Sequence, residues 1–280
     1  MTWLAVDWGT SRLRIWRDGA AEALTETAQG MNTLGPEDYG PILEPFGADT
    51  AVICGMAGAR QGWREASYAA VPCAPSHAPL TFASGATTVH ILPGLSQSSP
   101  ADVMRGEETQ IAGFLALNEG WDGVICLPGT HTKWVHVSSG EVVSFQTYLT
   151  GELFALLSEH SVLRHSLTPG NDADAYLDAV ETALSKPAAL AAQLFRLRAE
   201  NLLHDLDPVT AHARASGLLI GAELAAAKPY WLGQQVAVIG SGPMADNYAA
   251  ALTATGAAPA RADATDVTLA GLTAAYEAFA

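Results

Sequence analysis

The sequence is poor in basic residues and in cysteine, and both shortages exclude classes of protein. It contains 14 Lys and Arg residues against 29 Asp and Glu residues, which gives a net charge of −15. This charge repels nucleic acid and anionic membrane surfaces, so we expect neither as a partner. The three cysteines, Cys54, Cys73 and Cys126, form no Cys-x-x-Cys pair. They predict reduced, mostly buried thiols and not zinc or dithiol chemistry.

The sequence also lacks a long hydrophobic run. Its longest uncharged stretch, residues 66–101, is broken by Pro, Ser and Gly and is too polar for a membrane helix. The N-terminus has Asp7 and no basic region before an apolar one, so it predicts no signal peptide and a cytoplasmic protein. The eight histidines show no His-x-x-x-His spacing. We therefore predict no transition-metal site.

What the sequence has is a pattern that occurs twice. With 280 residues, 49% of them hydrophobic, the chain can bury substantial cores in one large domain or two ordinary ones. Residues 4–6 and 12–15 predict a hairpin, and residues 123–127, 133–137 and 142–145 predict a three-stranded meander. Helices follow each: a first over residues 107–117, and a mostly helical region over 152–227. Further strands are predicted at 52–54, 91–92 and 236–239, and a helix at 249–252.

Each repeat contains a glycine turn between its first two strands. The turns are Gly9-Thr10-Ser11 and Gly129-Thr130-His131. Glycine lets backbone N–H groups and small hydroxyls approach an anion closely. Either turn alone reads as an ordinary hairpin turn. Together they favour a duplicated fold that holds one polyphosphate.

Asp7 ends the first buried strand, just before the first glycine turn. An ionised carboxylate in that place needs a partner, or a metal-bound water. We expect Asp7 to hold the water shell of a Mg²⁺ ion on a nucleotide, since Mg²⁺ keeps several of its waters.

A third glycine motif, Gly240-Ser241-Gly242, follows the strand at 236–239. With Asp263 it resembles the fingerprint of a dinucleotide-binding dehydrogenase. Only 17 residues follow Asp263, too few for the remaining parallel strands and crossovers of that fold. The alternative, which we favour, is that this turn lets an adenosine lie against the backbone.

The basic residues, though few, gather in or beside glycine turns. They are Arg12, Arg60, Arg105 and Lys133. This placement indicates an anionic substrate. Glu107 and Glu108 follow Arg105 and Gly106 at a predicted helix start, where acidic residues also occur for purely structural reasons. An arginine and a carboxylate there can hold a hydroxyl for deprotonation beside an anionic group.

Several ordered motifs across nearly the whole chain resemble the 2-dehydro-3-deoxygalactonokinase family. They are Ala5-Val6-Asp7-Trp8-Gly9-Thr10-Ser11, Met104-Arg105-Gly106-Glu107-Glu108-Thr109-Gln110, Pro128-Gly129-Thr130-His131-Thr132-Lys133-Trp134, Thr150-Gly151-Glu152 and Ser216-Gly217-Leu218-Leu219-Ile220-Gly221-Ala222-Glu223. The glycine turns are shared with the wider superfamily of sugar kinases, Hsp70 and actin.

The resemblance implies an α/β fold of two ribonuclease-H-like domains, residues 1–122 and 123–280, with ATP in the cleft between them. It implies that Asp7, Gly9, Thr10 and Ser11 form a first phosphate motif and that Gly129, Thr130 and His131 form a second. Gly240, Ser241 and Gly242 would form the adenosine motif. Glu107 would be the catalytic base with Glu108 as the alternate, and Trp8, Arg60, Arg105 and Lys133 would bind substrate. Arg12 stands where the family would have a small or amide residue, which leaves open whether it reaches a phosphate.

The expected function is ATP- and Mg²⁺-dependent phosphorylation of the terminal hydroxyl of 2-dehydro-3-deoxy-D-galactonate. Two alternatives stay open: a kinase for another sugar or sugar acid, and a non-catalytic nucleotide-dependent binding or regulatory protein on the same fold. The partners are a sugar acid and ATP. The sequence leaves a homodimer open.

Overall fold

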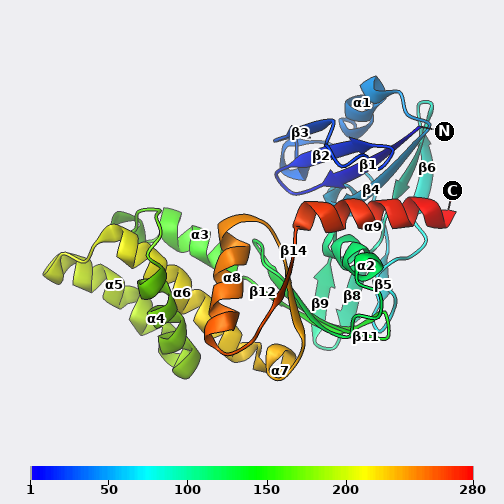
Figure 1. Ribbon diagram of the computed structural model, residues 1–280. Helices are drawn as coiled ribbons and strands as arrows, with labels where there is room; N and C mark the ends of the chain where they lie inside the picture. Colours follow the sequence, from blue (N-terminus) through cyan, green and yellow to red (C-terminus); the bar gives the residue numbers. More distant parts are fainter. Residues whose placement is uncertain (1, 280) are drawn as a thin grey trace. The chain divides into compact units, whose positions relative to one another are not determined.

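The computed structural model describes residues 2–279 and has a mixed α/β architecture (Figure 1). Its contacts divide it into two compact units. The first consists of Met1–Asp122, His136–Phe145 and Ala262–Ala280, and the second of Gly123–Val135 and Gln146–Arg261. One of the transitions between them falls after residue 122, where we place the domain boundary, and the last helix returns to the first unit.

The main sheet of the first unit has six strands in the order β3-β2-β1-β4-β7-β6. Strand β1 pairs antiparallel with β2, and β2 with β3, whereas β1, β4 and β7 run parallel. The sixth strand, β6, pairs antiparallel with β7. The strands are β1 (Trp3–Trp8), β2 (Leu13–Arg17), β3 (Thr25–Thr27), β4 (Thr50–Gly55), β6 (Leu80–Ser84) and β7 (Thr87–Ile91).

A second sheet of five strands has the order β12-β11-β10-β13-β14, and β10 runs parallel to β13. These strands are β10 (Gly123–Leu127), β11 (Thr132–Ser138), β12 (Glu141–Tyr148), β13 (Val236–Ile239) and β14 (Ala260–Ala262). In both sheets a meander of three consecutive strands is extended, beyond its first strand, by a parallel strand from later in the chain. This is the ribonuclease-H-like order, and its repetition confirms the predicted duplicated α/β fold.

Helices complete both units. The first contains α1 (Tyr39–Leu43), α2 (Glu107–Leu117) and α9 (Ala264–Phe279), with a small sheet of β5 (Tyr68–Ala70), β8 (Gly94–Ser98) and β9 (Ala101–Met104). The second contains α3 (Thr150–His160), α4 (Ala173–Ser185), α5 (Leu190–His204), α6 (Pro208–Ala226), α7 (Lys228–Trp231) and α8 (Gly242–Ala254). No helix within residues 2–279 is both long and apolar enough to cross a bilayer.

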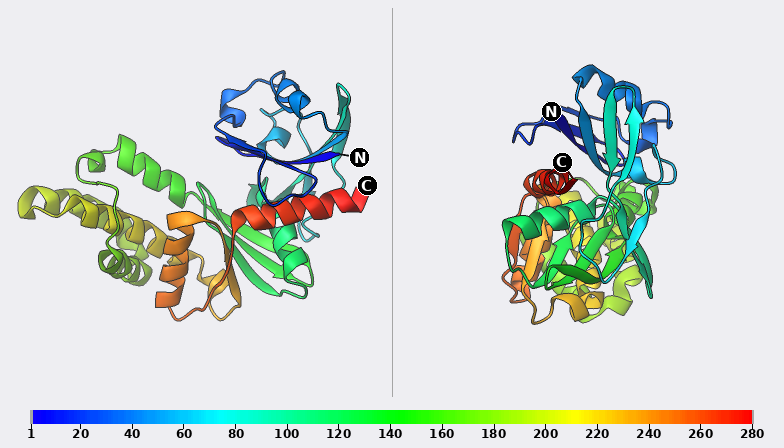
Figure 2. Two further views of the ribbon diagram at one scale, coloured as in Figure 1. Left: turned by 45° about the horizontal axis from the view of Figure 1, so that its top comes forward. Right: turned by 90° about the vertical axis from the view of Figure 1, so that its right-hand side faces the viewer.

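Strand β1 is buried on both faces, which explains why the last helix groups with the first unit. Leu4, Val6 and Trp8 face one core, while Trp3 and Ala5 face another. Helix α9 covers the second face (Figure 2), where Tyr276 stacks on Trp3 with ring centroids 4.3 Å apart. Burial of these aromatic rings provides a large apolar contact.

Two glycines let α2 and α9 cross with their backbones almost touching. A Cβ at Gly113 would lie 1.8 Å from the carbonyl oxygen of Val267, and one at Gly271 would lie 2.0 Å from that of Thr109. No side chain fits at either place. The crossing therefore fixes α2 against α9, which itself packs on β1. The carboxylates at the start of α2 are held in place with it.

The predicted bounds are confirmed for α2, β10 and β13. Helix α6 begins at Pro208, within the predicted helical region of residues 152–227, where the Asp207 carboxylate caps it by accepting from the N–H groups of Val209 and Thr210. Helix α8 begins at Gly242, before the predicted 249. The short strands β3, β5, β6, β8 and β9 are not predicted, because none is a buried apolar run.

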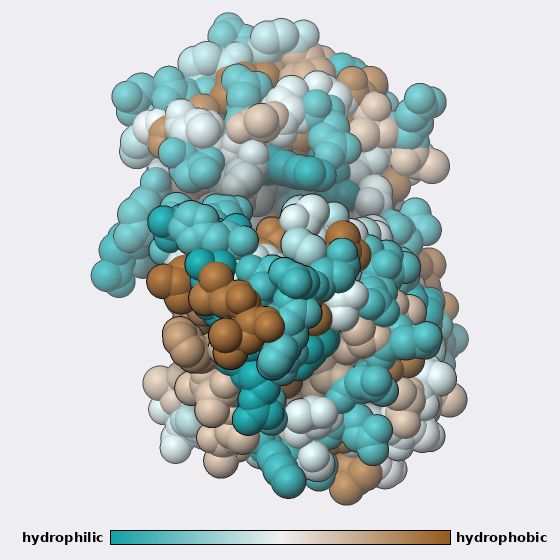
Figure 3. All heavy atoms as spheres, turned by 90° about the vertical axis from the view of Figure 1, so that its left-hand side faces the viewer, coloured by the Kyte–Doolittle hydropathy of each residue, from teal (hydrophilic) through white to brown (hydrophobic). Residues whose placement is uncertain are grey.

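Helices α3 and α5 leave large apolar side chains exposed. They include Leu153 and Leu156 on α3, and Phe195, Leu202 and Leu203 on α5. Figure 3 shows hydrophobic residues gathered in one patch on the face where α5 ends. The homodimer that the sequence leaves open stays a prediction.

Candidate functional site

The first glycine turn closes the β1–β2 hairpin as predicted. The Gly9 N–H donates to the Arg12 carbonyl at 2.8 Å, and the side chains of Thr10 and Ser11 are exposed. The Arg12 side chain is 78% exposed and pairs with Glu26 at 3.4 Å. Arg12 thus has a partner on the neighbouring strand β3.

Asp7 has a partner that the sequence reasoning missed. In the register of the hairpin Asp7 lies opposite Arg14. The guanidinium of Arg14 donates to Oδ2 of Asp7 from Nε at 3.2 Å and from Nη2 at 2.6 Å. The signal was in the sequence, because a four-residue loop at 9–12 pairs residue 7 with residue 14. Arg14 does not take Oδ1 of Asp7, and the Cys54 thiol lies 3.7 Å from this oxygen.

Two further glycines bring the start of α2 to the ends of β1 and β4. Gly55, at φ +82°, ends β4 against the carbonyl of Trp8, and a Cβ on Gly106 would lie 3.3 Å from the Cα of Gly55. Residues 7, 54 and 108 therefore converge. Burial, and then the nearby charges of Asp7 and Glu108, raise the pKa of the Cys54 thiol well above its ordinary value.

The two carboxylates that begin α2 differ in exposure. Glu107 is half-buried, and its Oε2 accepts from the Arg105 N–H at 3.1 Å. Glu108 is 1% exposed, and its Oε2 accepts from the Gly106 N–H at 2.6 Å. Burial, and then repulsion by Glu107, raise the pKa of Glu108 to about 8. The solvent-facing carboxylate is thus Glu107, and Glu108 points toward Cys54 and Thr109.

This burial predicts a pH dependence of stability. Between the ordinary pKa of 4.5 and about 8, Glu108 is ionised in the unfolded chain and protonated in the folded one, so the free energy of unfolding falls as pH rises through this window. Glu108→Gln does not ionise. It should gain stability over the wild type, on the order of a few kcal/mol, between pH 5 and pH 8, with no further gain above that. Urea unfolding across this pH range measures the difference, and parallel pH profiles for the two proteins would refute it.

Arg105 carries donors without acceptors. Its guanidinium stacks over the Tyr68 ring, 4.2 Å from the centroid, and Nη2 donates to the Ala66 carbonyl at 2.8 Å. Its Nε and Nη1 are buried and have no hydrogen-bond partner in the part of the chain that the structure describes. Gly58 leaves the space beside it, since a Cβ there would lie 2.8 Å from Nη1. Orphaned guanidinium donors are costly unless an anion pairs with them.

The other basic and aromatic candidates of the first unit are placed differently. The Arg60 side chain is 80% exposed and pairs with Glu65 at 3.3 Å. Trp8 is fully buried, and its indole N–H donates to the Gln29 carbonyl at 2.9 Å. The expected substrate contact by Trp8 is therefore corrected. Asp7 and Trp8 are neighbours on β1, so their side chains point to opposite faces of the sheet, and that of Trp8 lies in the core.

The second glycine turn lies against the start of α3. The Glu152 N–H donates to the Thr130 carbonyl at 2.9 Å, and a Cβ on Gly151 would collide with the Gly129 carbonyl at 2.3 Å. His131 contacts Glu152, Nε2 to Oε2, at 2.6 Å. Lys133 is 5% exposed, and its ammonium donates to the carbonyl of His131 at 3.4 Å. Lys133 thus supports the turn that precedes it.

The third glycine motif lies beside this turn. Strands β10 and β13 are parallel neighbours, and a Cβ on Gly240 would be 3.8 Å from Cδ of Pro128. Ser241 is the N-cap residue of α8, and Gly242 has φ +73°. Both motifs therefore lie at the carboxyl ends of adjacent parallel strands, which is where α/β folds bind ligands.

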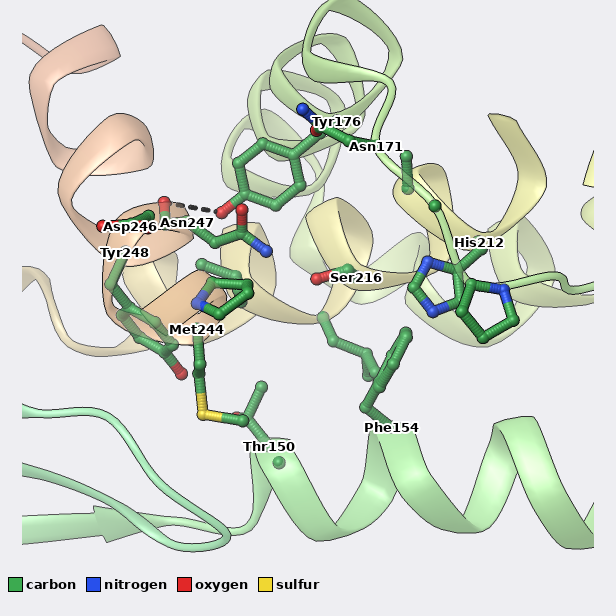
Figure 4. A pocket seen from close by; sticks show the side chains of 17 residues that line it. Thr150, Phe154, Asn171, Tyr176, His212, Ser216, Met244, Asp246, Asn247 and Tyr248 are labelled. Atoms are coloured by element: carbon green, nitrogen blue, oxygen red, sulfur yellow. Dashed lines mark hydrogen bonds between the residues drawn. The ribbon is translucent and has the colours of Figure 1, made fainter. Parts of the chain in front are cut away.

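A cavity of about 690 Å³ opens next to these two motifs (Figure 4). Its size lies within the range of small-molecule and cofactor pockets. Its walls are mainly apolar, with polar groups from Asn171, His212, Ser216 and Asn247. The hydroxyl of Tyr176 is not free, because it donates to the Asn247 carbonyl at 2.8 Å. Gly240, Ser241 and Gly242 are not among the residues that line this cavity; its α8 side begins at Pro243, and sequence reasoning missed its helical walls.

No group of three or more His, Cys, Asp or Glu side chains in the part of the chain that the structure describes could hold a metal ion. A divalent cation would therefore depend on one carboxylate, water and its ligand's own oxygens. Asp7, one-fifth exposed and with Oδ1 not taken by Arg14, fits such a role.

Comparison with known proteins distinguishes a kinase from the non-catalytic binding protein that the sequence left open. The family model for 2-keto-3-deoxy-galactonokinase matches residues 7–275. This chain belongs to the 2-keto-3-deoxy-galactonokinase family. It is 38% identical to DgoK1 of Rhizobium meliloti (strain 1021), named as a 2-dehydro-3-deoxygalactonokinase, over 98% of this chain and 96% of the relative. It is 36% identical to the 2-dehydro-3-deoxygalactonokinase of Escherichia coli (strain K12), over 81% of each chain.

A solved structure of a similar protein has the same fold. The crystal structure of a Sinorhizobium meliloti protein assigned as a 2-dehydro-3-deoxygalactonokinase superimposes with a TM-score of 0.88 at 37% identity, covering 99% of this chain and 96% of that one. The family resemblance and the α/β fold expected from the sequence are thus confirmed. The roles of individual residues in this family fold stay predictions.

Proposed function

We propose that this chain transfers the γ-phosphoryl group of ATP to the terminal 6-hydroxyl of 2-dehydro-3-deoxy-D-galactonate, in the cytoplasm. Membership of the 2-keto-3-deoxy-galactonokinase family over residues 7–275 carries the proposal. The geometry of each unit supports one half of the reaction. The second unit offers a nucleotide site, and the first offers a base and a carboxylate-binding group.

ATP would bind with its adenosine in the cavity beside Gly240–Gly242. Its phosphates would then extend toward Gly129, Thr130 and His131, whose backbone N–H groups and hydroxyl can cradle an anion. The apolar walls suit a planar base, and the exposed polar groups of Asn171, Ser216 and Asn247 can read its edge.

The Mg²⁺ on the nucleotide would be held through its waters by Asp7. When bound, this ion neutralises charge that spreads over the transferred group. Arg14 orients Asp7, because it donates twice to one carboxylate oxygen and does not take the other.

The sugar acid would place its carboxylate on Arg105. The two orphaned nitrogens Nε and Nη1 point to different sides of the guanidinium, and each can donate one charge-assisted hydrogen bond to an anionic group. Arg60 is exposed and already paired with Glu65, and Lys133 donates to the turn that precedes it, so neither matches Arg105 in offering buried guanidinium donors.

Glu107 would accept the proton of the attacking hydroxyl. It lies two residues from Arg105, is open to solvent, and is held at the start of α2 by the Arg105 N–H. A base in that place serves a substrate whose other end is bound by Arg105. Glu108, buried behind it, remains the alternate.

Coupled measurement of ADP formation tests the proposal against its alternatives. We expect ATP turnover to depend on an added sugar acid, with a lower kcat/KM for the gluconate epimer, which has the opposite configuration at one hydroxyl-bearing carbon, than for 2-dehydro-3-deoxy-D-galactonate. Faster turnover with the gluconate epimer would make the chain a kinase for a different sugar acid. Absence of stimulation by any sugar acid would favour a nucleotide-dependent binding protein.

Asp7→Asn tests the first turn. The amide keeps the shape and an oxygen for Arg14 but loses the charge, so kcat should fall on the order of tenfold to a hundredfold while the fold is retained. Asp49→Asn is the matched control, because the Asp49 carboxylate is exposed and accepts from the backbone N–H and the hydroxyl of Thr2. A wild-type kcat for Asp7→Asn at saturating Mg²⁺ would show that Asp7 has no role in the reaction.

A further inference from the structure

Glu223 is a buried carboxylate that the proposed reaction does not use. It lies on α6, in the last position of the Ser216–Glu223 motif, and is 4% exposed. No lysine or arginine pairs with it in the described part of the chain; its partners are neutral donors. A buried carboxylate is costly unless its oxygens are fully hydrogen-bonded.

The donors come from three different elements. Its Oε1 accepts from the indole N–H of Trp134 on β11 at 2.8 Å, and its Oε2 accepts from the Tyr248 hydroxyl on α8 at 2.7 Å. The hydroxyl of Thr150, the first residue of α3, also hydrogen-bonds to it. These bonds tie α6 to β11, α3 and α8 at one point.

The same bonds reach the second phosphate turn. Thr132 follows Gly129–His131 directly and is fully buried, and its hydroxyl lies 2.9 Å from that of Tyr248. Since the Tyr248 hydroxyl gives its proton to Glu223, Thr132 donates to Tyr248. The resulting chain runs from the turn through Tyr248 to Glu223.

Two members of this network also form walls of the cavity. Thr150 and Tyr248 both line it, and Figure 4 shows them on its α3 and α8 sides. Thr150 also begins the helix whose Gly151 and Glu152 pack against the turn. The relative positions of the turn, the α3 start and α8 therefore all depend on one carboxylate.

We propose that Glu223 is a positioning residue for nucleotide binding, which fixes Thr132, Thr150 and Tyr248 so that the cavity and the second phosphate turn are preorganised for ATP. The inference rests on the proposed ATP site. It deepens that site by giving a role in it to the last of the five family motifs, Ser216–Glu223. Preorganisation acts on affinity, because ordering these groups then costs nothing when the ligand binds.

The test is a pair of double-mutant cycles on the full chain, with the dissociation constant of Mg²⁺ and adenylyl imidodiphosphate measured by calorimetry. Glu223→Gln and Tyr248→Phe keep shape but change or remove the shared hydrogen bond. Each should weaken nucleotide binding on the order of tenfold, and the double variant should be about as weak as either single one. The KM for the sugar acid should stay unchanged, which separates positioning at the nucleotide site from general loss of structure.

Tyr176→Phe is the matched control. It removes another tyrosine hydroxyl at the same cavity, one that donates to the Asn247 carbonyl and not to Glu223. Combined with Glu223→Gln, its effect should be independent and multiplicative. If Glu223→Gln does not fold, Thr132→Val replaces it in the cycle with Tyr248→Phe.

Unchanged nucleotide affinity in folded Glu223→Gln and Tyr248→Phe would overturn the inference, as would multiplicative effects of that pair. If the wild-type chain itself bound no nucleotide, the proposed function would fall together with the inference. Wild-type binding with unaltered variants would overturn the inference alone.

Discussion

Glu107→Gln should lower kcat by about 10²–10⁴, because removal of a general base typically costs that much. The carboxylate is half-buried, is held by the Arg105 N–H at 3.1 Å, and sits at the start of a helix that is locked against α9. Glutamine keeps the volume and the accepted hydrogen bond but cannot take a proton. The dissociation constant of an ATP analogue should therefore hardly change, so that the loss appears in kcat.

Glu108→Gln is the matched control for this experiment. The two residues are adjacent on α2, but Glu108 is 1% exposed and its carboxyl faces Cys54 and Thr109. Its variant should act mildly on kcat and mainly on stability. A collapse of kcat in Glu108→Gln alone would move the base by one residue, and full activity in both variants and in the double variant would place it elsewhere.

Arg105→Ala should weaken binding of the sugar acid by about 2–5 kcal/mol, the usual cost of removing one partner of a desolvated charge pair. The physical reason is the pair of buried donors, Nε and Nη1, that have no acceptor among residues 2–279. Calorimetric titration with the sugar acid, in the presence of an ATP analogue, measures the change. The affinity for the nucleotide itself should stay as in the wild type.

Two variants control for this result. Arg105→Lys keeps the charge but replaces the two guanidinium donors Nε and Nη1 with one ammonium group, so it should recover only part of the affinity. Arg60→Ala removes an exposed arginine already paired with Glu65 and should have no effect on sugar-acid affinity. If Arg105→Ala bound the sugar acid like the wild type and Arg60→Ala did not, the carboxylate site would belong to Arg60.

The sequence predicted best what depends on local patterns. Helix α2 and strands β10 and β13 have the predicted bounds, because each is an uninterrupted apolar or amphipathic run between strong turn signals. The duplication was visible because both meanders have a glycine turn in the same place. Membership of the family followed from motifs that are ordered along the chain.

What the sequence could not predict depends on contacts far apart in the chain. Nothing local shows that α9 covers β1, or that Gly113 and Gly271 permit α2 and α9 to cross. The burial of Trp8 and Glu108 has the same origin, since both lie beside residues that the structure, and not their neighbours in sequence, brings close. Likewise the acceptors and donors around Glu223 come from residues 134, 150 and 248.

The kinase assignment is tested most directly by identifying the product of the reaction. The chain is incubated with Mg²⁺, ATP and 2-dehydro-3-deoxy-D-galactonate, and the mixture is followed by phosphorus NMR. We expect ADP and an equal amount of a phosphomonoester whose signal is split into a triplet by the two protons on C6. Release of ADP together with inorganic phosphate, with no sugar phosphate formed, would contradict phosphoryl transfer to the sugar acid.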